Sequence, residues 1–162
     1  MNVPLEQFTS PEVASFWRFI ASSLTRLVAI LDELSAEELN WRPPAPEANS
    51  LYALAIHTLG NVEENVLETL CGQPVHRERE AEFRAAGSSA ASVQDRWQAL
   101  RPRLESALAS LSAADLDRHY LHPRRDDETG REVLIVVARH AAEHLGQAEL
   151  TRDLLRASTP FQ

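Results

Sequence analysis

Hydrophobic residues recur every three or four positions in four long segments of the chain, which is the spacing of a helix with one buried face. The first segment opens with Ser10-Pro11-Glu12, a cap, a proline and an acidic residue suited to a first helical turn. The second ends at Gly72, a natural stop for a helix. The expected helices span about 11–34, 50–72, 92–111 and 131–156. We therefore predict an all-α protein.

The segments between these helices predict how they are joined. Prolines exclude a helix over 43–46, and the polar stretch 73–91 forms a long connection. The stretches LDELSAEELNW (31–41) and LASLSAADLDR (108–118) share a layout, and each contains a candidate capping box. These boxes pair Ser35 with Glu38 and Ser112 with Asp115. Internal duplication or convergence on a common cap would both produce this layout.

Two helical hairpins follow from this layout, and together they predict a four-helix bundle. The connection of about 19 residues between the hairpins is long enough to run the length of the bundle. The second and third helices therefore need not be antiparallel. We assign the whole chain, residues 1–162, to one domain.

Composition narrows the classes of function. The chain has 24 acidic and 16 basic residues and a net charge of −8, which argues against nucleic acid as a partner. All the basic residues are arginine, as expected of a GC-rich bacterial genome. Cys71 is the single cysteine, which excludes an internal disulfide and a cysteine-rich zinc site. No signal peptide or apolar run of about 20 residues is evident, so we expect a cytoplasmic protein without a membrane partner.

The strongest chemical signal is a histidine pair in the fourth segment. His140 and His144 are four residues apart, so both imidazoles lie on one face of a helix and could share a metal ion. That face also carries Val133 and Val137, which places the pair within the apolar stripe. Two core histidines that hydrogen-bond to side chains of other helices are the alternative.

A third ligand is needed, and His57 is the remaining histidine within an expected helix. It falls at the edge of its apolar stripe, which weakens the argument from periodicity. His76, His119 and His122 lie in expected loops and are secondary candidates. Three neutral histidines without a thiolate suit an open catalytic zinc site better than a closed structural one.

Two long stretches, NSLYALAIHTLGNVEENVL and VARHAAEHLGQAELTRDLL, together resemble the DinB-like superfamily of metal-binding four-helix bundles. The family has one histidine early in its second helix and His-x-x-x-His followed by Gly-Gln in its fourth. The resemblance implies a divalent metal held by His57, His140 and His144. Zinc is the first candidate, and nickel, manganese and iron are alternatives. The family includes transferases and isomerases that use low-molecular-weight bacterial thiols.

Other motifs admit a second interpretation. His140 to His144 also fits the inverted zinc-protease pattern H-x-x-E-H with Glu143 as base, but no strands are evident to hold a peptide. Cys71 is expected to be a packed core residue. Four arginines near the helix entries could hold an anionic substrate or simply keep the surface soluble, and these are Arg42, Arg124, Arg125 and Arg131.

The leading hypothesis is a metal-dependent enzyme of small-molecule chemistry. Transfer of a low-molecular-weight thiol comes first and metal-assisted hydrolysis second, with no catalytic residue assigned. The loops 40–49 and 112–130 are expected at the same end of the bundle, beside the histidines. A non-catalytic metal-stabilised bundle and a metal-free dimerisation module are the alternatives. Phe19 falls off its apolar stripe, so we expect a homodimer.

Overall fold

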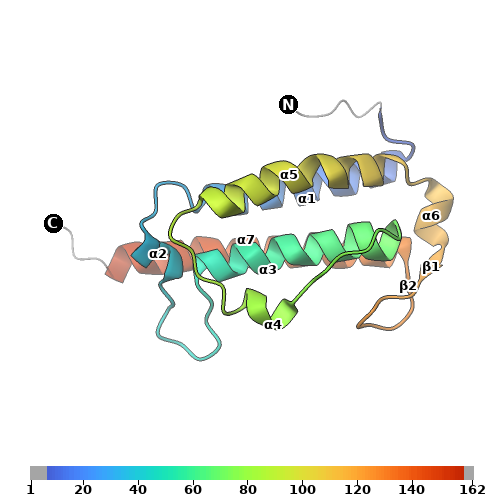
Figure 1. The fold of residues 1–162 in the computed structure, drawn as a ribbon. Coiled ribbons are helices and arrows are strands. Elements are labelled where there is room, and N and C mark those ends of the chain that lie inside the picture. Colours follow the sequence, from blue (N-terminus) through green and yellow to red (C-terminus); the bar gives the residue numbers. More distant parts are fainter. Residues whose placement is uncertain (1–6, 159–162) are drawn as a thin grey trace.

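Four long helices lie side by side in the computed structural model, which describes residues 7–158 (Figure 1). The second of them continues from α-helix into a π-helical stretch, η2. The long elements are α1 (Pro11–Ala29), α3 (Leu51–Glu63) with η2 (Glu64–Leu70), α5 (Ala91–Ala109) and α7 (Gly130–Ser158). The predicted all-α four-helix bundle is confirmed.

The helix directions follow from contacts between their ends. Helix α1 runs antiparallel to α5, because the Thr9 backbone N–H donates to the Ala109 carbonyl at 3.0 Å and Gln94 donates to Asp32 at 2.6 Å. Helix α1 runs parallel to α7, since Arg131 contacts Glu12 near the start of both helices and Arg26 contacts Glu149 further along both.

Helices α3 and α5 also run parallel to each other. Arg96 donates to the Ile56 carbonyl at 3.4 Å. About two turns further along both helices, Arg103 donates to Glu63 at 3.1 Å. The connection between these two helices therefore returns along the length of the bundle, as its length allowed. It contains a short helix, α4 (Arg79–Glu82), which packs on the outer side of α3 (Figure 1). We call residues 72–90 the crossover.

Short elements close the ends of the bundle. They are α2 (Ala36–Asn40), α6 (Ala113–Asp117), β1 (His119–Tyr120) and β2 (Glu128–Thr129), and the two strands pair antiparallel. Helices α2 and α6 begin at Ser35 and Ser112, and both predicted capping boxes are present. Among residues 7–158 no longer strand occurs.

Two helices differ from their predicted extent. Helix α1 ends at Ala29, before the predicted end near Leu34, and residues 30–33 form a turn. In that turn Glu33 takes a left-handed backbone (φ 63°), just before the cap of α2. The second helix widens into a π-helix at Glu64, which hydrophobic spacing does not reveal. Gly72 has φ 64°, as expected of a glycine that ends a helix.

The two loops expected at one end of the bundle lie at opposite ends. Helices α3 and α7 are antiparallel, so the loop 40–49 precedes α3 at one end and residues 112–129 precede α7 at the other (Figure 1). That second segment instead contacts η2, where Arg125 donates to the side chain of Asn65 at 2.9 Å. None of the helices within 7–158 is both long and apolar enough to span a bilayer.

Candidate metal centre

Three histidines from two antiparallel helices converge near the middle of the bundle. The Nε2 atom of His140 lies 3.1 Å from Nε2 of His57 and 3.1 Å from Nε2 of His144. One nitrogen from each ring lies within 4.8 Å of the other two. The structure thus brings together the three residues that the sequence singled out.

Helix α3 is buried around almost its whole circumference, and this explains the position of His57. Residues 51–62 are buried except Ile56, which is half-buried. The crossover covers the outer side of α3, so a residue at the edge of the apolar stripe becomes interior. His57 is 4% exposed for this reason.

Hydrogen bonds at the Nδ1 atoms set the direction of the ring lone pairs. His57 Nδ1 lies 2.9 Å from a carboxylate oxygen of Glu82, and His144 Nδ1 lies 2.6 Å from the amide oxygen of Gln147. Both partners accept, so both Nδ1 atoms carry the proton and both Nε2 atoms present a lone pair. His140 Nε2 faces both lone pairs and can donate a proton to only one of them.

The spacing of these nitrogens fits a common divalent ion. Imidazole nitrogens bind zinc at about 2.0 to 2.1 Å, so two ligands of one ion lie about 2.9 to 3.4 Å apart in octahedral or tetrahedral geometry. The two observed separations of 3.1 Å fall in that range. Hydrogen bonding leaves the His140 ring incompletely satisfied, because Nε2 can donate to only one of its two neighbours and Nδ1 is buried without a partner among the described residues. The donor set therefore fits a metal better than a self-sufficient polar core.

The surroundings keep the imidazoles of His140 and His144 neutral, as metal ligation requires. Burial lowers the pKa of His140 to about 3, and the nearby His144 and His57 add to this effect. Burial also lowers the pKa of His144, while its bond to Gln147 opposes the shift. At neutral pH both rings have a free lone pair.

Two charged residues of the crossover join the site, and the sequence analysis did not identify them. Burial alone would raise the pKa of Glu82, but hydrogen bonds and charge from Arg77 and His57 lower it to about 2. Arg77 also donates to Glu64 at 3.0 Å, and Arg124 contacts the same oxygen. Side chains of Arg77, Glu64 and Glu82 are at most 8% exposed.

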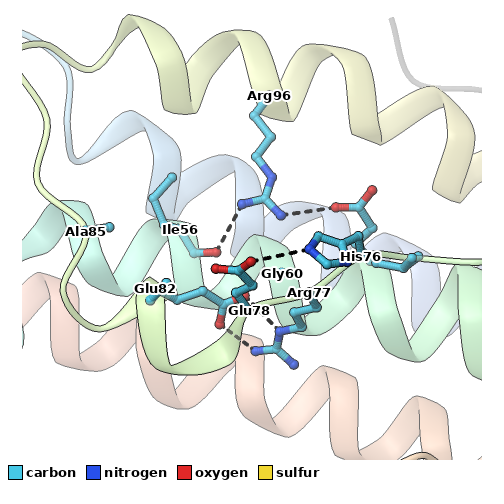
Figure 2. A pocket seen from close by; sticks show the side chains of 11 residues that line it. Ile56, Gly60, His76, Arg77, Glu78, Glu82, Ala85 and Arg96 are labelled. Atoms are coloured by element: carbon cyan, nitrogen blue, oxygen red, sulfur yellow. Dashed lines mark hydrogen bonds and ion pairs between the residues drawn. The ribbon is translucent and has the colours of Figure 1, made fainter.

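A cavity of about 410 Å³ lies on the outer side of α3. Figure 2 shows Arg77 and Glu82 on one wall and Arg96 opposite them, reaching toward the carbonyl of Ile56. Gly60 also lines the cavity. None of the three clustered histidines lines it, whereas Glu82 both lines the cavity and contacts His57 Nδ1.

The secondary histidine candidates lie outside the cluster. The side chain of His76 is 91% exposed, and His119 pairs with Asp127 at the surface. His122 is buried, but its Nε2 lies 3.9 Å from Glu64 and its Nδ1 accepts from the Arg124 backbone.

Each of the loop arginines is engaged within the chain. Arg42 donates to the carbonyls of Ala48 and Phe83. Arg125 pairs with Glu128, and Arg131 pairs with Glu12. These contacts favour a structural role over binding of an anionic substrate.

The geometry does not support the inverted zinc-protease pattern. The side chain of Glu143 is 57% exposed and pairs with Arg139 on the surface of α7, away from the converging nitrogens. Cys71 packs partly buried against the core, and burial raises the pKa of its thiol. A raised pKa makes a cysteine a poorer nucleophile at neutral pH.

Comparisons with known proteins agree with this architecture. The profile of the DinB superfamily matches residues 20–148. No curated protein matches the chain. A conserved protein from Enterococcus faecalis superposes with a TM-score of 0.70 at 18% identity, covering 89% of this chain and 96% of that one. A DinB-like protein from Bacillus cereus gives 0.67 at 19% identity, covering 86% and 89% respectively. At such identities the solved structures show the fold alone.

Proposed function

Because this chain belongs to the DinB superfamily and three of its histidines converge, we propose that it binds a divalent metal ion for small-molecule chemistry. His57, His140 and His144 are the proposed ligands. Zinc is the first candidate, followed by nickel, manganese and iron. The observation that carries the proposal is the 3.1 Å approach of His140 Nε2 to two lone-pair nitrogens.

The reaction we propose first is transfer of a low-molecular-weight thiol, with hydrolysis as the second choice. A divalent ion held by three imidazoles supplies a Lewis acid that lowers the pKa of a thiol or water at a remaining position. The chain's own residues would hold the ion from two helices. His57 is fixed from α3, and His140 and His144 from successive turns of α7. The packed helices exclude water from the His57 ring, which is buried, whereas His140 and His144 are half-buried.

Metal analysis of histidine variants tests the ligand set. Replacing any one of the three histidines with alanine should remove most of the divalent metal from protein purified without a metal column. His76→Ala, which changes an exposed histidine, is the matched control and should retain it. Stoichiometric metal in the triple variant would contradict the assignment.

Binding of an added ligand to the metal distinguishes a catalytic site from a purely structural one. A cobalt-substituted sample should develop a sulfur-to-metal charge-transfer band when a low-molecular-weight thiol is added. The second candidate, a non-catalytic metal-stabilised bundle, is favoured by the position of the cluster between α3 and α7, where an ion would tie two helices together. A cobalt spectrum unchanged by thiol, carboxylate and water-derived ligands would support that candidate.

A further inference from the structure

We propose that Glu82 is a positioning residue that directs the Nε2 lone pair of His57 toward His140 and His144. The inference concerns the crossover and names residues that ligate nothing themselves. It rests on the proposed metal site for its functional meaning, but its structural part can be measured in metal-free protein.

The carboxylate of Glu82 has its orientation fixed on both oxygens. Oε2 lies 2.9 Å from His57 Nδ1 and 2.8 Å from Arg77 Nη2. Oε1 lies 2.8 Å from Arg77 Nε. A two-pronged arginine contact of this kind holds a carboxylate in one plane, so Glu82 is presented to His57 in one orientation.

The same contacts decide which nitrogen of His57 carries the proton. Arg77 Nη2 also lies 3.4 Å from His57 Nδ1, but a guanidinium cannot accept a hydrogen bond. Glu82 is therefore the acceptor for an Nδ1 proton, and Nε2 is left with its lone pair. A carboxylate behind a ligating histidine fixes the tautomer and raises the basicity of the ring.

Arg77 is itself anchored away from the histidines. Its Nη1 donates to Glu64 at 3.0 Å, at the start of the π-helical stretch. Phe83, directly after Glu82, packs against the His57 ring, and the two ring centroids lie 4.3 Å apart. The crossover thus supplies both the hydrogen-bond partner of His57, Glu82, and an aromatic ring, Phe83, that limits rotation of the His57 ring.

Gly60 makes the approach of Glu82 possible. It lies one helical turn after His57, and a Cβ atom there would overlap Oε1 of Glu82 and come within 3.2 Å of Arg77 Nε. The cavity in Figure 2 adjoins both Gly60 and Glu82, so a displaced carboxylate has space to move into. An alanine at this position should therefore misplace Glu82 without unfolding α3.

Glu82→Gln tests the role of the carboxylate. Arg77 would donate to the single amide oxygen of the glutamine, so the amide NH₂ would face His57 Nδ1. An NH₂ donor at this place favours the His57 tautomer that is protonated at Nε2. Nitrogen-15 NMR of the metal-free imidazoles should show this change of tautomer at His57. Zinc affinity, measured by chelator competition, should fall about 10- to 100-fold. Glu78→Gln is the matched control, because it removes the same charge from the crossover at an exposed side chain that contacts His76 instead.

Gly60→Ala provides a second test that alters neither charge nor ligand. It should lower zinc affinity over the same range, whereas Gly146→Ala should not, since a Cβ at Gly146 meets nothing within 4 Å. Absence of metal from the wild type would overturn the proposed function and leave the tautomer measurement to decide the role of Glu82. An unchanged His57 tautomer in Glu82→Gln would overturn this inference, as would zinc affinity within twofold of wild type in Glu82→Gln and Gly60→Ala.

Discussion

His122 is buried although it lies in the connection between two short strands. It is 3% exposed, and its Nδ1 accepts from the Arg124 backbone N–H at 3.0 Å. Burial lowers its pKa below the ordinary value, and the charge of Arg125 adds to this effect while Glu64 opposes it. The unfolded chain, in which the pKa returns to about 6.5, therefore binds this proton more readily than the folded protein.

The free energy of unfolding should therefore depend on pH through His122. The stability of the folded protein is not reduced by His122 above about pH 6.5, where this side chain is neutral in both states. Stability is lost as the pH falls from there toward the lower pKa of the folded state, because the unfolded chain takes up the proton first. Denaturant titrations of metal-free protein between pH 7.5 and 5 should show a shallower loss of stability in His122→Asn than in wild type. Because His140 and His144 titrate in both proteins, their effect cancels in the comparison. Parallel curves would contradict the prediction.

At the scale of elements, the two capping boxes make a matched pair. In each, the serine side chain accepts a backbone N–H from the third helical residue, and that residue's carboxylate accepts the serine backbone N–H. They begin helices of only five residues, so the helix interior contributes little to holding the chain in place.

Removing either cap should therefore be measurable in global stability. Ser35→Ala and Ser112→Ala should each lower the free energy of unfolding by about 1 kcal/mol. Ser22→Ala, at an exposed position inside α1, serves as the control and should leave stability unchanged or slightly higher. Equal stability of all three variants in urea titrations would show that the caps do not hold α2 and α6.

Local signals predicted some elements well and others poorly. The serine caps and Gly72 are short-range features, and each was identified from the sequence because its geometry depends on a few adjacent residues. The π-helical stretch begins at Glu64, whose side chain contacts Arg77 and Arg124 from segments distant in the sequence. Spacing along one helix cannot reveal such contacts.

At the scale of the whole molecule, we expect self-association. Phe19 on α1 is 53% exposed and Ile135 on α7 is 49% exposed, and these two helices pack side by side. Light scattering at tens of micromolar should give about twice the chain mass of 18.1 kDa. Phe19→Ser should shift the protein toward monomer, whereas Leu121→Ser, which changes an exposed leucine elsewhere, should not. A wild-type monomer would contradict the expectation.

The candidate site was predictable only in part, for reasons of distance along the chain. His140 and His144 are four residues apart on one helix face, so their spacing alone predicted that they would lie together. His57 came from its place in an expected helix and from a family resemblance. Glu82 and Arg77 lie in a stretch dense in charge, which is typical of a solvated loop. Their burial arises from the parallel course of α3 and α5, a global property that brings the crossover back over α3.

The crossover should also be a site of local unfolding. Residues 72–78 form no regular helix or strand, so amide protons there should exchange with solvent at a lower free energy than those of the four long helices. If Glu82 positions His57, closure of this segment and occupancy of the histidines are thermodynamically coupled, and the coupling is reciprocal. Zinc should slow amide exchange around Glu82, and a substitution that speeds this exchange should weaken zinc binding.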